Sequence, residues 1–247
     1  MEKEKVVIIQ QLNKSFGTNK VLKGVDLHLN RGENLVVLGK SGTGKSVLIK
    51  CIVNLVEPDN GQINALGIDV SAAGQEELNS LRQKIGFLFQ GAALYDSMTV
   101  KENLEFPLKR HHTKISRSDT DEKVITALQN VGLEQSLNKM PSELSGGMKK
   151  RIGLARSLIL EPEIMLYDEP TTGLDPITSN EISELIIEVR EKFKTSSIII
   201  THDIHCAQLT SNRIVILNEG KIFAEGNFEE LSKSNDKFIA SFFNTSH

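Results

Sequence analysis

The chain has 247 residues, of which 39% are hydrophobic and 25% are charged, and its formal net charge at pH 7 is −3. This length and composition are ordinary for a globular protein with a sizeable core. The slightly acidic balance argues against a protein that binds nucleic acid through a broad basic surface. No stretch approaches the ~20 consecutive apolar residues of a membrane span, and the charged residues 1–5 do not resemble a signal peptide, so a cytosolic protein is expected.

The N-terminal part of the chain alternates short apolar runs with turns, which predicts strands around one helix. Strands are expected at 6–9, 25–29, 35–38, 62–65 and 85–89, a polar turn at 13–19, and a helix at about 45–54. From Ser97 to about Leu160 the pattern becomes mainly helical, with an exposed polar connection at 109–121 and a helix start near Ser118.

After Leu160 the chain returns to alternating strands and helices. Strands are expected at 164–167, 198–200, 213–217 and 221–224, and a helix at 177–192. The simplest arrangement is an α/β fold with one parallel-sheet core, a helical subdomain inserted at about 91–160 and a short tail at about 232–247. Cys51 and Cys206 form no CxxC pair, and their apolar helical surroundings predict two buried free thiols.

A glycine-rich loop directly follows the apolar run 35–38 and precedes a helix, which is the setting of a phosphate-binding loop. Its glycines let successive backbone N–H groups turn toward a polyphosphate, and the helix N-terminus adds partial positive charge. Lys45 would reach the β- and γ-phosphates, and the Ser46 hydroxyl would bind Mg²⁺. An ordinary glycine-rich turn would match this pattern by chance in about one chain in a hundred. The residues expected to bind a nucleoside triphosphate are Gly39, Lys40, Ser41, Gly42, Thr43, Gly44, Lys45 and Ser46.

Two adjacent carboxylates end the apolar strand expected at 164–167. Such a strand would carry Asp168 to the phosphate site, where the carboxylate can hold Mg²⁺ through water. Glu169 would then lie near an attacking water and act as its general base or orient it. Taken alone, the pair would be interpreted as solvated acids at a strand end, but the phosphate loop favours the catalytic interpretation.

A second candidate anion site lies at Ser145-Gly146-Gly147, which opens the helix expected to run to about Leu160. Ser145 is a good helix N-cap, and the two glycines expose backbone N–H groups at a positive helix end. An ordinary capped helix explains the same residues, and local physics leaves both interpretations open.

The run Leu144–Met148 resembles the signature loop of ATP-binding-cassette (ABC) ATPases, in the family's order between the phosphate loop and the two carboxylates. Gln90 resembles the Q-loop glutamine, which touches Mg²⁺ and senses the transporter. Asp175 in Gly173-Leu174-Asp175 resembles the D-loop, and His202 the switch histidine that contacts the γ-phosphate. Phe16 stands where the family places an aromatic that stacks on adenine, although a lone Phe near a strand end is also a common core residue.

This resemblance covers essentially the whole chain and implies one ABC ATPase domain, 1–247, with a P-loop core, an antiparallel β subdomain and an inserted helical subdomain. It implies that two copies sandwich two ATP molecules with Mg²⁺, each site joining the phosphate loop of one copy to Ser145 and Gly147 of the other. ATP would favour the closed dimer and hydrolysis would remove that preference. A membrane permease would be the further partner, at the cytoplasmic face of the inner membrane.

The segment after the Q-loop, residues 90–100 followed by 102–104 and 106–108, resembles the ATPase subunit of Mla-type lipid transporters. Those systems move phospholipids with a permease and a substrate-binding protein of the mammalian-cell-entry (MCE) kind. Met148, where glutamine is usual, is similar to that family, but it also appears in ABC importers of betaine-like solutes. The ATPase of a small-solute importer is therefore the alternative.

Two other classes of protein are disfavoured. A soluble ABC protein acting on ribosomes or DNA usually has tandem cassettes or a long coiled-coil insertion, and this sequence has neither. A nucleotide-binding module without turnover would not be expected to carry both Glu169 and His202.

A basic run, a histidine pair and the C-terminal tail are interpreted from their local sequence. The basic run 149–151 is expected to form a solvated or subunit-facing surface rather than a nucleic-acid site. His202 and His205 are not expected to bind a metal together, and His205 is interpreted as a helix-surface residue. The tail 236–243 predicts either a short docking helix or a frayed amphipathic end.

Overall fold

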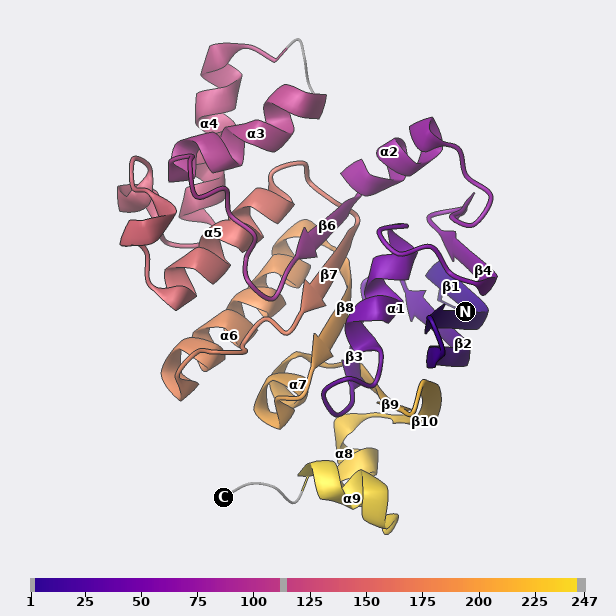
Figure 1. The fold of residues 1–247 in the computed structure, drawn as a ribbon. Coiled ribbons are helices and arrows are strands. Elements are labelled where there is room, and N and C mark those ends of the chain that lie inside the picture. Colours follow the sequence, from indigo (N-terminus) through magenta and orange to yellow (C-terminus); the bar gives the residue numbers. More distant parts are fainter. Residues whose placement is uncertain (1–2, 112–114, 244–247) are drawn as a thin grey trace.

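The chain folds around two β-sheets, and the structure, a computed structural model, describes residues 3–111 and 115–243. A six-stranded sheet has the order β10-β9-β3-β8-β7-β6, and a four-stranded sheet has the order β2-β1-β4-β5 (Figure 1). The strands are β1 (Lys5–Phe16), β2 (Asn19–Asn30), β3 (Asn34–Leu38), β4 (Asn60–Ala65), β5 (Ile68–Asp69), β6 (Ile85–Leu88), β7 (Ile164–Asp168), β8 (Ser196–Thr201), β9 (Arg213–Asn218) and β10 (Lys221–Gly226).

The six-stranded sheet is parallel from β6 to β9, and only the hairpin strand β10 runs antiparallel to its neighbour. Its central strands β3, β7 and β8 are buried along their whole length, as expected for a parallel sheet covered on both faces. Successive residues of β3 point to opposite faces: Val36 and Leu38 join one core, and Leu35 and Val37 the other.

The two cores contain different helices. The helices are α1 (Lys45–Ile52), α2 (Gln75–Gln83), α3 (Val100–His111), α4 (Arg117–Gln129), α5 (Gly146–Leu158), α6 (Pro176–Phe193), α7 (Ile204–Thr210), α8 (Phe228–Ser232) and α9 (Lys237–Phe243), with 3-10 turns η1 (Glu134–Ser136) and η2 (Pro141–Glu143). Helix α1 lies between the two sheets, whereas α5, α6 and α7 cover the other face of the large sheet (Figure 1). This arrangement confirms the expected α/β fold with an antiparallel β subdomain beside a parallel core.

Helices α3, α4 and α5 pack together beyond the edge strand β6 (Figure 1). Helix α4 begins slightly earlier than predicted, because the side chain of Ser116, rather than Ser118, accepts the Asp119 N–H and caps it. Residues 112–114 of the predicted polar connection lie outside the described residues. No helix among the described residues is long and apolar enough to cross a membrane.

The polar turn predicted at 13–19 is present but shorter, because only residues 17 and 18 form it. β1 continues to Phe16 and β2 begins at Asn19, so the polar residues 13–15 belong to a long antiparallel hairpin. An antiparallel pair can expose one face to water, so polar side chains do not exclude a strand there. The patterns also missed β5, α2 and α8, which are short or largely polar.

The predicted tail helix forms as α9, and it packs on its own chain. The ring of Phe238 lies edge-on to those of Phe223 and Phe242, and Phe243 packs against Phe228 of α8 in the same way. Ile239 and Phe242 of this helix are buried, so the described part of the tail is not a frayed end. Residues 244–247 lie outside the described residues.

The predicted buried thiols are confirmed. Cys51 and Cys206 are both fully buried and free, and burial raises the pKa of each to about 11. Neither thiol is therefore ionised near neutral pH.

Candidate active site

The glycine-rich loop connects the end of β3 to the start of α1 and leaves the first turn of that helix open. Gly44 occupies the N-cap with a φ of 102°, a left-handed conformation, and no side chain caps the helix. A Cβ on Gly39 would lie 2.6 Å from the Leu217 carbonyl oxygen, so the loop has no room for a side chain there. The uncapped N–H groups at the N-terminus of α1 are the donors that an anion requires.

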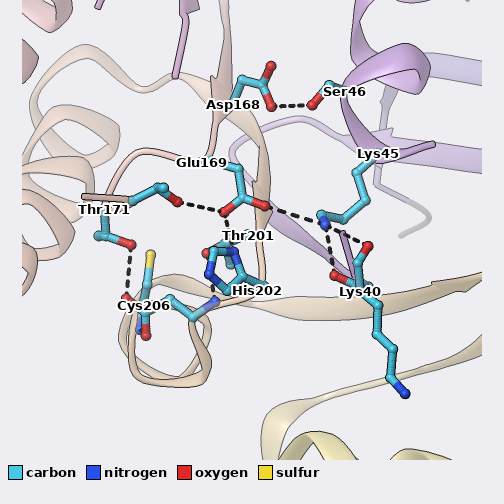
Figure 2. Close-up of polar contacts among 12 residues, drawn as sticks. Lys40, Lys45, Ser46, Asp168, Glu169, Thr171, Thr201, His202 and Cys206 are labelled. Carbon is cyan, nitrogen blue, oxygen red and sulfur yellow. Dashed lines mark hydrogen bonds and ion pairs between the residues drawn. The ribbon is translucent and has the colours of Figure 1, made fainter. Parts of the chain in front are cut away.

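Lys45 lies beneath this loop with only 5% of its side chain exposed. Its Nζ donates to the Gly39 carbonyl at 2.7 Å and to the Lys40 carbonyl at 3.2 Å, and it lies 3.4 Å from Glu169 Oε1 (Figure 2). The ammonium is thus held at the mouth of the loop, facing the carboxylate that follows β7.

Ser46 and Asp168 form a second pair at the same place. The Ser46 hydroxyl donates to Asp168 Oδ1 at 2.6 Å, and Asp168 is almost fully buried at the end of β7 (Figure 2). Together with the nearby Gln90 amide, these groups supply oxygen atoms from a hydroxyl, a carboxylate and an amide. Mg²⁺ takes such ligands while keeping several waters, so the residues present fit that ion.

Glu169 is held by its side chain and by its backbone. Its carboxylate accepts the Thr172 hydroxyl at 3.1 Å. The same carboxylate lies 2.8 Å from His202 Nδ1 (Figure 2). Its φ is 50°, in the left-handed region that non-glycine residues rarely adopt. The Glu169 N–H donates to the Ile200 carbonyl of β8 at 2.9 Å, which helps to hold this conformation. Backbone strain of this kind is concentrated at functional sites.

These groups surround a cavity of about 460 Å³. Its lining consists of Phe16, Val21, Ser41, Gly42, Gly44, Lys45, Ser46, Val47, Gln90, Glu169, Thr172 and His202. Most residues predicted from the sequence therefore meet here, while Gly39, Lys40 and Thr43 shape the loop without lining the cavity. Phe16 is 51% exposed at the end of β1, so it is not the core residue that the alternative interpretation required.

The signature and D-loop residues lie outside this cavity. Ser145 caps α5 by accepting the Met148 N–H at 3.3 Å, and Asp175 caps α6 by accepting the N–H of Ile177 and of Thr178 at 3.1 Å each. The two loops pack on each other: a Cβ on Gly146 would lie 3.4 Å from Leu174 Cδ2, and one on Gly147 would lie 2.5 Å from Thr178 Cγ2. Within one copy of the chain, Ser145, Gly146, Gly147 and Asp175 are therefore not brought to the phosphate loop.

The interpretation of residues 149–151 as a solvated or subunit-facing surface is wrong for Lys150. Lys150 is buried with 5% exposure, and its Nζ donates to the Glu169 carbonyl oxygen at 3.0 Å. Burial lowers the pKa of this ammonium to about 8, against the opposing effect of the Asp168 and Glu169 carboxylates. Helical spacing in the sequence could have predicted this burial. Lys150 lies three residues after Gly147 and four before Leu154, on the buried face of α5.

Two other local observations complete the site. Thr172, which sequence reasoning missed, binds the Glu169 carboxylate from three residues further on. His205 is an exposed residue of α7, as interpreted, and its Nε2 lies 3.0 Å from Asn180 Oδ1. No cluster of three or more His, Cys, Asp or Glu residues that could hold a metal occurs in the part of the chain that the structure describes.

The fold and the site define a P-loop nucleoside triphosphatase with a helical subdomain beside its core. The profile of the ABC transporter family matches residues 22–172, and the chain belongs to this family. It is therefore an ATPase that binds ATP with Mg²⁺ and energises a membrane transporter.

Relatives of known name cover nearly the whole chain. It is 39% identical over 236 residues to the "Probable ribonucleotide transport ATP-binding protein mkl" of Mycobacterium leprae, covering 96% of this chain and 68% of that protein. It is 40% identical over 261 residues to "Protein TRIGALACTOSYLDIACYLGLYCEROL 3, chloroplastic" of Arabidopsis thaliana, covering 98% and 75%. It is 36% identical over 223 residues to the "Methionine import ATP-binding protein MetN" of Rhizobium johnstonii, covering 90% of this chain but only 61% of that protein.

A solved structure shares the fold. The dimeric, post-hydrolysis state of the ATP-binding cassette MJ0796 bound to ADP and Pi superposes with a TM-score of 0.82 at 31% identity. The match covers 90% of this chain and 98% of that one.

Proposed function

We propose that this chain hydrolyses ATP in the cavity between the phosphate loop and Glu169, and that hydrolysis drives the transport of phospholipid. The observation that carries the catalytic assignment is the convergence on Glu169. Glu169 has a strained backbone. Its carboxylate lies 3.4 Å from the Lys45 ammonium and 2.8 Å from the His202 imidazole.

The roles of the residues follow from their positions. The loop from Gly39 to Ser46 binds the phosphates through its N–H groups, with Lys45 reaching the β- and γ-phosphates. Glu169 receives a proton from the attacking water, and His202 contacts the γ-phosphate. Ser46, Gln90 and Asp168 would hold Mg²⁺, which would supply positive charge to neutralise the phosphates. Phe16, exposed at the cavity rim, stacks on adenine.

The second half of each site comes from a second copy of the chain. Ser145 and Gly146 are exposed at the start of α5, outside their own chain's cavity, where they can reach the nucleotide of a partner. Gly147, which the resemblance also implied for this contact, is instead buried against Thr178. Ile177, beside Asp175, is 75% exposed, which is unusual for a large apolar residue and suits an interface. The cassette MJ0796, which is dimeric with ADP and Pi, supports the same assembly for this chain.

The loop after Gln90 is the docking site for the permease. Tyr95 is 43% exposed, and its ring packs on Phe106 with centroids 4.9 Å apart. The buried Asn103 holds this loop by accepting the Tyr95 N–H at 2.8 Å and by donating to the Tyr95 carbonyl at 3.1 Å. A firmly held, partly apolar loop at the edge of the helical subdomain, residues 91–160, is suited to binding a membrane partner.

Phospholipid is the proposed cargo because the loop resembles that of Mla-type ATPases. The relative named after a galactolipid, trigalactosyldiacylglycerol, supports a lipid cargo more generally. An MCE-type binding protein completes the proposed complex, in which this chain lies at the cytoplasmic face of the inner membrane. The methionine import relatives favour the alternative, a small-solute importer.

The test is to tag the chain in its native cells, extract the complex in mild detergent, and identify co-purifying proteins and lipids by mass spectrometry. A permease with an MCE-type protein and enriched phospholipid supports the proposal, whereas a solute-importer permease without them supports the alternative. A Tyr95→Ser variant is the matched control. It is expected to lose the permease while still binding ATP, because Tyr95 does not line the nucleotide cavity.

A further inference from the structure

The buried Lys150 is a charged group that the proposed hydrolytic roles do not use. It belongs to α5, the helix that Ser145 caps and that begins with Gly146 and Gly147. Its side chain runs inward and ends at the Glu169 carbonyl oxygen, 3.0 Å from Nζ. One lysine thus joins the signature helix to the peptide of the carboxylate proposed as general base.

The hydrogen bond from Lys150 is made to a residue whose backbone is strained. Glu169 has a φ of 50°, and its N–H is held by the Ile200 carbonyl of β8. On the other side its carbonyl oxygen receives the Thr172 N–H at 3.3 Å and the Lys150 ammonium at 3.0 Å. A charged donor makes a stronger hydrogen bond than a neutral amide, so Lys150 contributes the firmer contact on this side.

Stability alone does not account for a lysine at this position. Burial disfavours its ammonium form, as the lowered pKa shows. An apolar side chain of similar volume would fill the same space without desolvating a charge. The contribution of the ammonium is therefore a fixed contact at Glu169 rather than a gain in folding free energy.

We infer that Lys150 is a positioning residue that links the Glu169 peptide to the signature helix. The position of residues 145–147 then determines the orientation of the Glu169 carboxylate. This inference rests on the proposed role of Glu169 as general base. It would couple the two ATP sites of a dimer, because the signature residues proposed to touch the partner's ATP belong to the same helix, α5, as the lysine that binds the Glu169 carbonyl oxygen.

The first test compares the full-length Lys150→Met and Lys150→Arg variants with the wild type. We expect the methionine variant to lose roughly 10- to 100-fold in kcat, the scale of a small misplacement of a reacting group, with KM for ATP within about twofold. The arginine variant keeps a charged donor and should retain most of kcat. Lys123→Met is the matched control, because Lys123 of α4 forms a partly exposed surface ion pair with Glu161.

Thermal unfolding of the same proteins separates positioning from folding. The melting temperature of Lys150→Met should stay close to that of the wild type near neutral pH, because the relief of the lysine's desolvation offsets the loss of its attraction to Asp168 and Glu169. A loss of kcat that only parallels a fall in melting temperature would overturn the inference. An unchanged kcat in Lys150→Met, or a folded Lys150→Arg as slow as Lys150→Met, would also overturn it.

The second test asks whether Lys150 acts through Glu169. In a Glu169→Gln background, residual single-turnover hydrolysis should be the same with and without Lys150→Met, because the group being positioned is gone. A further loss on adding Lys150→Met would mean that the lysine acts elsewhere. If Glu169→Gln alone hydrolyses ATP at the wild-type rate, the proposed role of Glu169 fails instead, so the two failures are distinguishable.

Discussion

The substitution Glu169→Gln tests the site most directly, because it removes one charge and one basic group without changing the side chain's size. In the structure the carboxylate accepts the Thr172 hydroxyl and lies 2.8 Å from His202 Nδ1 and 3.4 Å from Lys45 Nζ. The glutamine amide oxygen can still accept one of these hydrogen bonds. It cannot take a proton from water, and it presents no negative charge to the ammonium.

The size of the effect follows from the role. A positioned general base contributes about 10²- to 10⁴-fold to the rate. At about 1.36 kcal/mol per factor of ten, this corresponds to roughly 2.7–5.4 kcal/mol of activation free energy. The binding of ATP should change far less, because the phosphate loop and the Ser46–Asp168 pair are intact.

The assay is phosphate release at saturating ATP and Mg²⁺, with nucleotide binding measured separately at equilibrium. Thermal unfolding checks that the variant is folded, and Glu161→Gln, on the exposed surface, is the matched control. A Glu169→Gln protein that keeps kcat within tenfold of the wild type would refute the general-base assignment, whatever its affinity for ATP.

Three other predictions address the phosphate loop, the core and the acid stability. Lys45→Ala should abolish productive ATP binding, since this ammonium is held at the loop mouth, and normal turnover in that variant would contradict the phosphate-loop interpretation. Tyr167→Phe should raise the free energy of unfolding by about 1–3 kcal/mol, because the Tyr167 hydroxyl is buried with no hydrogen-bond partner among the described residues. A lower free energy of unfolding for the variant, measured by calorimetry, would contradict this. For Glu33, burial raises the carboxyl pKa, but the Arg213 guanidinium and the Asn30 N–H together lower it below its ordinary 4.5. The contribution of the ionised Glu33 to stability is therefore present above pH ~4.5 and is lost as the pH falls through the lower folded-state pKa. Glu33→Gln should flatten the acid side of a plot of melting temperature against pH. An unchanged plot would show that the Glu33–Arg213 pair does not contribute.

Local spacing was enough to predict the phosphate loop and the strand that carries the two carboxylates. Both consist of an apolar run followed directly by polar residues, and this pattern can be recognised from the local sequence alone. The turn predicted at 13–19 was too long because pairing partners, not local polarity, decide whether a polar segment is a strand. The short elements β5 and α8 lack a long periodic pattern, so tertiary contacts had to define them.

The sequence by itself determined the family and the order of the motifs, because each motif is a contiguous run whose chemistry follows from its own residues. Only the tertiary structure brought Ser46 to Asp168, which lie far apart in the chain, and turned the Glu169 backbone into the left-handed region. It also buried Lys150, which the sequence alone had suggested was a surface residue. Contacts between segments distant in sequence depend on how sheets and helices stack, and that packing is a property of the whole chain rather than of any one segment.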